Sequence, residues 1–278
     1  MQNLIDSVLQ SQNKTSAQPF SVYAACREQS LLNVPVPKPM LVCVLKGNKE
    51  LGSEPAFNVA AGHFVWLPGS AFVDMRNIPW QSNYLALLLE FEPQEFDALP
   101  LEEHSDSAYI SGLLNEELTL ALTQFIEWSA SVPQALWSSR RKEILQLLHY
   151  QGCQGLASLV QHKSLANQIH RMIVNNPMAE LTATSISSQL AMSEATLHRK
   201  LKSQGASLQG IKDQARLGLG LHLIQTTMQP IGQIAEHCGY ISPSRFTDKF
   251  KQQFGTTPRE LRRTQLNDTN VSVESIGR

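Results

Sequence analysis

Residues 231–258 read IGQIAEHCGYISPSRFTDKFKQQFGTTP, and this stretch decides the fold of the C-terminal part of the chain. It predicts a short helix, a tight turn at Gly239 and a second helix. Phe246, Phe250 and Phe254 are spaced four residues apart, so they share one face of the second helix and leave the polar side chains on the other. A helix-turn-helix needs this arrangement, because one face must enter the core while the other stays free for a DNA groove.

A similar pattern lies upstream, at residues 181–202. Ile186 and Leu190 are spaced to share the buried face of its first helix, and Leu197 and Leu201 that of its second. If Leu197 and Leu201 face the core, helical geometry places three other side chains of this helix on the outer face and a histidine on the flank. The outward residues are Ala195, Arg199 and Lys202, and the flanking residue is His198.

The two units together resemble the DNA-binding module of the AraC/XylS family of bacterial transcription regulators. The residues of the second unit that match the family are Ile231, Ile234, Ala235, Gly239, Tyr240, Ser242, Phe246, Phe250, Phe254, Gly255 and Pro258. With the single helix expected between the units, the resemblance covers about 165–265. It implies a transcription regulator that binds double-stranded DNA, with two recognition helices in successive major grooves on one DNA face.

Residues 18–93 contain short apolar runs separated by Gly, Pro and Asn, a pattern that predicts strands. No helical pattern interrupts them, which excludes a doubly wound sheet and favours a small sandwich or barrel. We expect a hairpin turn within 46–52. The segment 60–68 (AAGHFVWLP) resembles a signature of the cupin-like sensor domains of the same family. The residues expected in the barrel interior are Val42, Val44, Phe64, Trp66 and Leu87.

The fold class that follows is α+β, with two domains. Apolar residues recur at helical spacing over 116–149, and the resemblance implies two helices there that pack on the barrel and form a homodimer; simply covering the barrel is the alternative. Residues 1–155 would form a cupin-like sensor or dimerisation domain, a β-barrel with two helices. Residues 164–266 would form an all-α DNA-binding module with two helix-turn-helix motifs.

Charge divides the chain in the same way. The formal net charge is −1. Residues 165–278 hold 13 Lys and Arg against 8 Asp and Glu, whereas residues 1–164 hold 10 against 16. A basic C-terminal part suits a phosphate-binding surface, and DNA would repel an acidic N-terminal part.

The cysteines and the N-terminus indicate the compartment. Cys26, Cys43, Cys153 and Cys238 show no C-x-x-C spacing, so we expect reduced, buried thiols, with redox sensing through Cys26 or Cys43 as the alternative. The N-terminus lacks the pattern of a signal peptide, and no apolar run is long enough for a membrane span. We therefore expect a soluble, cytoplasmic protein without a membrane partner.

Two other classes of protein fit the sequence less well. A cupin enzyme needs a cluster of His and carboxylate ligands, whereas His63 stands alone in the strand region. Some DNA-repair proteins join a similar module to a reactive cysteine, but their Pro-Cys-His-Arg motif is absent. We therefore expect a protein that is not an enzyme and has no catalytic residue, metal ligand or cofactor.

The predicted DNA contacts fall on and around the two recognition helices. Arg199 and Arg245 are the candidates for guanine, since a guanidinium donates two hydrogen bonds to O6 and N7. Asp248 would accept from cytosine or orient Arg245, or would be a surface charge without a role. The predicted base contacts are Ala195, His198, Arg199, Ser244, Arg245 and Asp248. The predicted phosphate contacts are Ser193, Lys202, Ser242, Lys251, Thr257 and Arg259.

Two glycines interrupt the helix expected between the two units. Gly218 and Gly220 each cost a helix roughly 1 kcal/mol relative to alanine. Close packing against a neighbouring helix is one explanation. The other is a softened linker that lets the two recognition helices adjust to the groove spacing.

The partners beyond DNA follow from the resemblance. Most members of the family activate transcription by touching RNA polymerase, so we expect an activator, with repression as the alternative. The N-terminal domain would receive its signal from a small molecule or a protein. Tyr23, His63 and Trp66 are the candidates for a ligand pocket, because each combines an apolar body with a polar tip; the rival prediction places them in a packed core.

Overall fold

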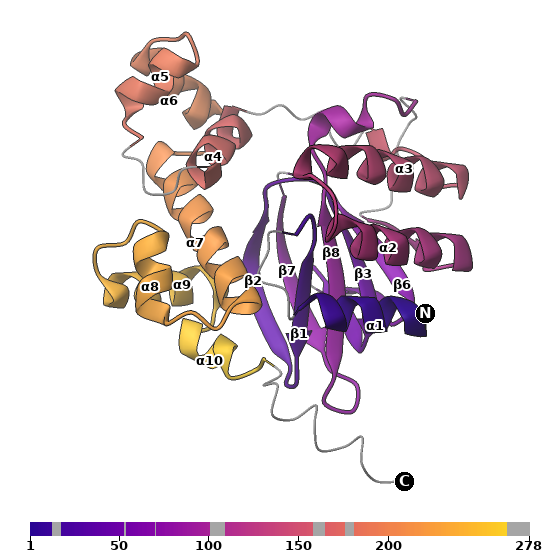
Figure 1. Cartoon of the computed structure of the whole chain (residues 1–278). Coiled ribbons are helices and arrows are strands. Elements are labelled where there is room, and N and C mark those ends of the chain that lie inside the picture. The colour runs from indigo at the N-terminus through magenta and orange to yellow at the C-terminus, as the bar shows by residue number, and fades with distance from the viewer. Residues whose placement is uncertain are drawn as a thin grey trace.

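The computed structural model describes residues 1–12, 18–52, 54–69, 71–100, 109–157, 165–175 and 181–265. An N-terminal lobe of strands, with helices packed on one side, lies beside a C-terminal lobe of helices (Figure 1). The architecture is the predicted one, an α+β protein with a cupin-like β-domain followed by a helical domain. Among the described helices, none combines the length and the apolar character that crossing a bilayer demands.

The strands of the N-terminal lobe form two antiparallel sheets. They are β1 (Ser21–Ala25), β2 (Gln29–Val36), β3 (Met40–Lys46), β4 (Asn48–Leu51), β5 (Phe57–Ala60), β6 (His63–Leu67), β7 (Ala71–Ile78), β8 (Tyr84–Glu90) and β9 (Ile110–Leu113). One sheet has the strand order β1-β8-β3-β6-β9 and the other β2-β7-β4-β5. Apolar side chains from both sheets meet in one buried cluster, which is the interior of the barrel.

The first sheet is buried on both of its faces. Val42 and Val44 of β3 enter the barrel interior, as predicted. Phe64, Trp66 and Leu87 were predicted there too, but they point to the opposite face, where helices cover them. The physical reason is the alternation of side chains along a strand: when both faces are apolar, the pattern no longer tells inside from outside.

Three helices cover the outer face of that sheet: α1 (Gln2–Ser11), α2 (Glu116–Ser129) and α3 (Trp137–Tyr150). Short 3-10 turns, η1 (Pro93–Phe96) and η2 (Gln134–Leu136), lie before β9 and α3. The two helices predicted over 116–149 are therefore present. Their buried side chains, including Leu122 and Leu145, share one core with Trp66.

The hairpin turn predicted within 46–52 was wrong. Gly47, with φ 78°, ends β3, and β4 begins at Asn48, but the two strands belong to different sheets. The chain crosses between the sheets there, and β4 pairs with β5 and β7. This strand is hard to recognise in the sequence, because a charged residue, Lys49, occupies an inward position beside Leu51.

The C-terminal lobe consists of short helices arranged around one long one. They are α4 (Leu165–Asn175), α5 (Ala183–Gln189), α6 (Glu194–Ser203), α7 (Leu208–Thr226), α8 (Ile231–His237), α9 (Pro243–Phe254) and α10 (Pro258–Arg262). Two separate apolar cores lie along α7. Its first half packs with α4, α5 and α6, and its second half packs with α8, α9 and α10.

The second of these cores extends into the N-terminal lobe. Leu31 of β2 is buried in the same cluster as Phe250 and Phe254 of α9. Gln253 Nε2 donates to the carbonyl of Asn33 at 3.0 Å, and the backbone N–H of Cys26 donates to the carbonyl of Thr264 at 2.7 Å. The second half of the helical lobe is thus docked on strands β1 and β2. The predicted domain boundary includes residues 158–164, which lie outside the described residues.

Candidate nucleic-acid interface and effector cavity

The first helix-turn-helix consists of α5 and α6. Thr182 and Ser193 begin the two helices, and each side-chain oxygen accepts a backbone N–H of the first turn. Ile186, Leu197 and Leu201 are buried, which leaves the rest of α6 outside. The local sequence therefore produces the predicted motif: capped helix starts with one apolar face each.

The second helix-turn-helix consists of α8 and α9. Phe246, Phe250 and Phe254 are fully buried and stack edge-on along the inner face of α9. Ser242 caps the helix start, and Gly255, with φ 78°, ends the helix in the left-handed conformation that glycine adopts without strain. The three aromatics anchor the helix and turn its opposite face to solvent.

The six predicted base contacts all lie on exposed positions of the two recognition helices. They are Ala195, His198 and Arg199 on α6 and Ser244, Arg245 and Asp248 on α9. Among the described ion pairs, none joins Arg245 to Asp248, so the structure gives no support to a fixed orientation of that guanidinium. Lys249, on the flank of α9, pairs instead with Asp213 of α7 at 3.2 Å.

The predicted phosphate contacts divide into two kinds. Lys202, Lys251 and Arg259 are exposed cations. The hydroxyls of Ser193, Ser242 and Thr257 each accept a backbone N–H at the start of a helix. Thr257 in addition forms a reciprocal capping box with Glu260, whose pKa is lowered, chiefly by the hydrogen bonds from Thr257. These three hydroxyls therefore cap helices. Their contact with DNA phosphates, expected from the sequence, stays a prediction.

The two glycines of α7 mark close approaches of neighbouring groups. A Cβ on Gly220 would lie 2.8 Å from the ring of Phe246, and one on Gly218 would lie 2.8 Å from Cγ of Pro35. Close packing therefore explains both glycines. The first explanation named a neighbouring helix. The neighbour of Gly218 is instead strand β2 of the other lobe.

The three predicted pocket residues have three different environments. Tyr23 lines a cavity between the lobes, and its hydroxyl lies 3.2 Å from Nδ1 of His222 on α7. His63 is partly exposed at the start of β6 and does not line that cavity. Trp66 is fully buried against Phe91 and Phe96 and does not line that cavity, so it lies where the rival prediction placed it, in a packed core.

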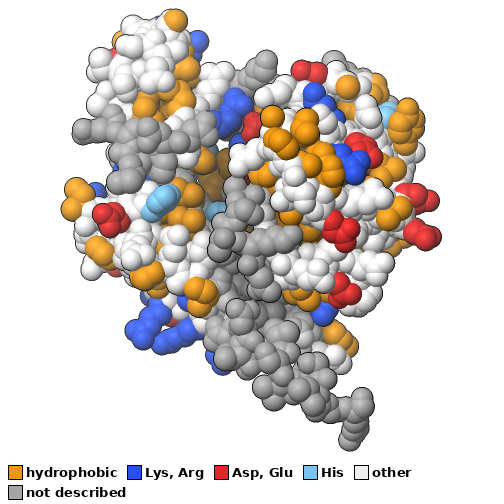
Figure 2. Space-filling model, in the orientation of Figure 1, with side chains coloured by type: hydrophobic (Ala, Val, Ile, Leu, Met, Phe, Trp, Pro, Cys, Tyr) orange, Lys and Arg blue, Asp and Glu red, His pale blue; other side chains and the backbone are white. Residues whose placement is uncertain are grey.

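The cavity itself has a volume of about 420 Å³, within the range of small-molecule sites. One end enters the barrel interior, and the other reaches α4 and α7. Figure 2 looks into the hollow between the two lobes, where hydrophobic side chains are visible in its depth. Its apolar walls include Val42, Leu67, Tyr84, Leu88 and Leu221.

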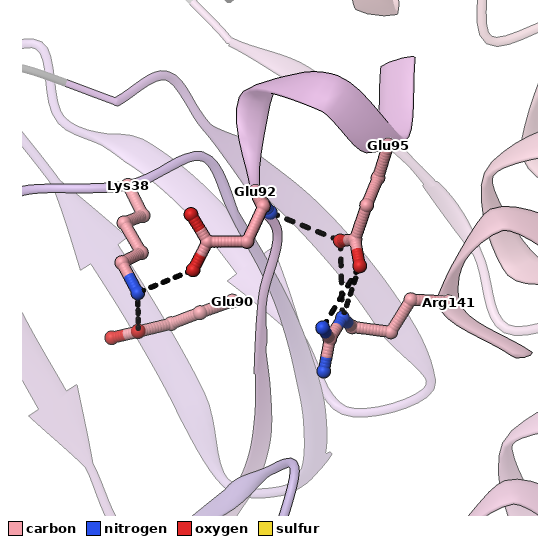
Figure 3. Close-up of polar contacts among 5 residues, drawn as sticks. All are labelled: Lys38, Glu90, Glu92, Glu95 and Arg141. Atoms are coloured by element: carbon pink, nitrogen blue, oxygen red, sulfur yellow. Dashed lines mark hydrogen bonds and ion pairs between the residues drawn. The ribbon is translucent and has the colours of Figure 1, made fainter. Parts of the chain in front are cut away.

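Charged side chains gather at one edge of the cavity (Figure 3). Lys38 Nζ lies 2.7 Å from Glu92 and 3.9 Å from Glu90. Burial raises the pKa of Glu90, although Lys38 opposes this shift. Arg141 of α3 donates to the carboxylate of Glu95 in η1 through Nε and Nη2. The shortest of these contacts, from Nη2 to Oε1, is 2.8 Å. These pairs set two cations against three carboxyl groups, so the edge has one carboxyl group in excess.

Two further ionisable groups of the cavity wall were missed by sequence reasoning. Lys49 of β4 is 4% exposed, and burial lowers its pKa to about 7. His170 of α4 is 9% exposed, neither of its ring nitrogens has a hydrogen-bond partner among the described residues, and burial lowers its pKa to about 4. One signal in the sequence could have identified Lys49: it stands two residues before Leu51, at a position that alternates with outward side chains and therefore faces inward.

Comparison with known proteins bears on the C-terminal part first. A family model described as a helix-turn-helix domain matches residues 186–264. GadX, an HTH-type transcriptional regulator of Escherichia coli, is 33% identical over 101 residues, which are 36% of this chain and 37% of GadX. RhaS, an HTH-type transcriptional activator of Escherichia coli, is 24% identical over 186 residues, which are 66% of each chain. The match with GadX thus spans little more than a third of that relative's length.

The fold of the whole chain resembles that of ToxT from Vibrio cholerae. Apo ToxT matches with a TM-score of 0.66 at 14% identity, covering 91% of this chain and 100% of that one. A ToxT structure with an unsaturated fatty acid bound matches with a TM-score of 0.62 at 14% identity, covering 88% and 95%. The fold and the site therefore define a two-domain protein whose C-terminal domain is a DNA-binding helix-turn-helix module. Residues 186–264 contain the helix-turn-helix domain that the family model describes, and this part of the chain is similar to the HTH-type transcription regulators GadX and RhaS.

Proposed function

We propose that this chain is a sequence-specific transcription regulator that reads DNA with α6 and α9 and acts in the cytoplasm. The observation that carries the proposal is the pair of recognition helices. Each is anchored by buried side chains, each exposes its polar face, and both are attached to α7. Two helices held in this way suit successive major grooves on one face of the duplex.

Within this proposal, Arg199 and Arg245 read guanine, and the other four base contacts complete the readout. Lys202, Lys251 and Arg259 bind phosphates without regard to sequence. Ser193, Ser242 and Thr257 bind phosphates at the starts of their helices, where the backbone N–H groups that the caps do not use carry the positive end of the helix dipole.

The test compares affinity for the site with affinity for random DNA. Genomic footprinting of the tagged protein would identify the site. Arg199→Ala and Arg245→Ala should each cost about 1–3 kcal/mol on that site and leave random DNA nearly unaffected. Lys251→Ala should weaken binding to both DNAs and flatten the salt dependence. An equal loss on both DNAs for Arg199→Ala would overturn the base-reading role.

We also propose the division of the chain at 155–164. A fragment from residue 164 to 266 would contain α4 to α10 and should fold and bind DNA, whereas 1–155 should not bind it. Leu31 lies in the core of the second unit, so the fragment should be less stable than the same helices in the whole chain. An unfolded fragment would contradict the boundary.

The proposed mode of action is activation through contact with RNA polymerase, with repression as the alternative. The names of RhaS and of a urease operon transcriptional activator of Escherichia coli support activation. A reporter fused to the footprinted promoter would distinguish the two modes.

We further propose that α2 and α3 form a homodimer, because Leu120 and Tyr150 are exposed there. Light scattering of Leu120→Asp against wild type would test it.

The signal proposed for the N-terminal domain is a small molecule in the cavity between the lobes. The cavity is apolar, has the right volume and touches β1, β2, α4 and α7 at once. The ToxT structure with a bound fatty acid supports an effector that combines an apolar chain with a carboxylate. Tyr23→Phe removes the bond to His222 and should change the response to an effector more than it changes the melting temperature. The alternative is a protein effector. An effector that still binds after the cavity has been filled by larger side chains would favour this alternative.

A further inference from the structure

One amine lies inside the barrel without a carboxylate partner. Lys49 shares the inward face of β4 with Leu51, and its Nζ lies 2.8 Å from Oδ1 of Asn77 and 3.2 Å from Sδ of Met75. Among the described ion pairs none includes Lys49. Burying an ammonium group away from water is costly unless an anion or several hydrogen bonds compensate, and the lowered pKa of Lys49 reflects that cost.

The same amine lines the cavity. The other cations of the cavity wall, Lys38 and Arg141, already have carboxylate partners. Lys49 therefore differs from them, because an anion that enters the barrel end of the cavity would meet an uncompensated donor there. The surrounding walls, which include Val42 and Leu88, would cover an apolar chain.

A chain of buried hydrogen bonds leads from Lys49 to the other lobe. Asn77 Nδ2 donates to Oε1 of Gln29 at 2.9 Å, and Gln29 Nε2 donates to Oγ1 of Thr264 at 2.7 Å. Gln225 of α7 donates to the same Oε1 at 3.4 Å. Asn77, Gln29 and Gln225 are 1%, 4% and 7% exposed, so water does not easily replace a lost bond.

The order of donors along this chain begins at the amine. Lys49 Nζ donates to the side-chain oxygen of Asn77, and Asn77 gives its NH₂ to Gln29. Gln29 must then turn its oxygen to Asn77 and Gln225, which leaves its NH₂ for Thr264. A change in the position of Nζ therefore affects groups at the end of α7 and after α10.

We propose that Lys49 is the residue that binds the anionic group of an apolar effector, and that the chain through Asn77 and Gln29 couples this binding to the docking of the DNA-binding module. The inference rests on the proposed control of the chain by a small molecule in the cavity. An anion draws Nζ away from Asn77, Asn77 releases Gln29, and the bonds to Thr264 and Gln225 weaken. The second helix-turn-helix is then held less firmly on β2.

The first experiment tests recognition of the anion in the full-length chain. The probes are dodecanoate and 1-dodecanol, which share a chain and differ in charge, and binding is measured by titration calorimetry. Lys49→Met should weaken dodecanoate binding about 10- to 100-fold and leave 1-dodecanol unchanged. Lys46→Met, at the end of the preceding strand β3 and partly exposed, is the matched control and should bind dodecanoate like wild type.

The outcomes of this experiment separate the two proposals. Equal dodecanoate affinity of wild type and Lys49→Met would overturn the role of Lys49, and so would a wild type that binds no dodecanoate. DNA binding measured on the same preparation tests the regulator proposal independently. Methionine removes a buried charge and keeps the side-chain length, so Lys49→Met should fold; Lys49→Gln is the second variant, with the same expected loss.

The second experiment tests the coupling. Hydrogen exchange of β2 and of the end of α7, with and without dodecanoate, reports how firmly the module is docked. In wild type, dodecanoate should speed exchange in both segments. Gln225→Met and Thr264→Val should bind dodecanoate within about twofold of wild type but show a smaller change in exchange. Gln209→Met, at the exposed start of α7, is the control. A full response in both coupling variants would overturn the relay.

Discussion

The two helix-turn-helix units have the same motif but different surroundings. Among the described residues, the apolar core of the first, α5 and α6, is shared with α4 and the first half of α7. The second, α8 and α9, shares its core with Leu31 of β2. The barrel therefore shares an apolar core with one recognition helix and not, among the described residues, with the other.

The turns of the two units differ as well. The first turn places Ala191 in the left-handed region, with φ 50°, whereas the second uses Gly239, with φ 77°. An alanine is strained in that region and a glycine is not. The first unit thus carries a strained residue that the second avoids.

The largest expected effect comes from the core that the second unit shares with β2. Phe250→Ala should cost about 3–5 kcal/mol and speed hydrogen exchange in β2. Leu197→Ala, the matched change in the first unit, should cost about 2–5 kcal/mol without affecting β2. If both variants exposed β2 equally, the difference between the units would disappear.

Acid should loosen the first unit through His170 of α4. The pKa of His170 is about 4 in the folded protein and 6.5 in an unfolded chain, so the unfolded state binds more protons between these values. Stability from this group is complete above pH 6.5 and falls, by up to about 3 kcal/mol, as the pH drops to 4. His170→Phe should remove that part of the pH dependence of unfolding.

The glycines of α7 separate docking from folding of the second unit. Gly218→Ala forces a Cβ toward Pro35 of the barrel and should weaken docking by about 1–3 kcal/mol, seen as faster exchange in β2. Gly220→Ala presses on Phe246 and should disturb the second unit itself. Unchanged exchange in Gly218→Ala would mean that the lobes separate easily in solution.

The smallest effect concerns the strained turn of the first unit. Ala191→Gly should stabilise the protein by about 0.5–1 kcal/mol, because glycine adopts φ 50° without strain. Gly239→Ala should do the opposite in the second unit. The comparison needs only thermal melts, and a destabilised Ala191→Gly would show that the turn is not strained.

The helical lobe was largely predictable, and the reason is visible in its residues. Phe246, Phe250 and Phe254 share one face at helical spacing, and the capping residues Ser193 and Ser242 begin the two recognition helices. Such signals are local, because periodicity and capping depend on neighbours within one or two turns. The exposure of the six base-contact candidates followed from the same periodicity.

The barrel was predictable as a class but not in its details. Trp66 and Phe64 were placed inside because β6 is apolar on both faces, and local pattern does not distinguish two buried faces. Strand β4 was missed because Lys49 interrupts its alternation, although that lysine is the most informative residue of the cavity. A prediction from local sequence pattern expects apolar residues at the inward positions of a strand, so a charged residue there argues against the assignment of a strand.

The sequence by itself determined the two-domain order, the helix-turn-helix motifs and the paired recognition helices, because these depend on motif, spacing and periodicity. Only the tertiary structure decided that β2 docks on the second unit, that Gly218 faces Pro35 and that Lys49 connects through Asn77 and Gln29 to α7. Each of these contacts joins residues far apart in the chain. Their partners are chosen by how the folded lobes fit together, which no local pattern contains.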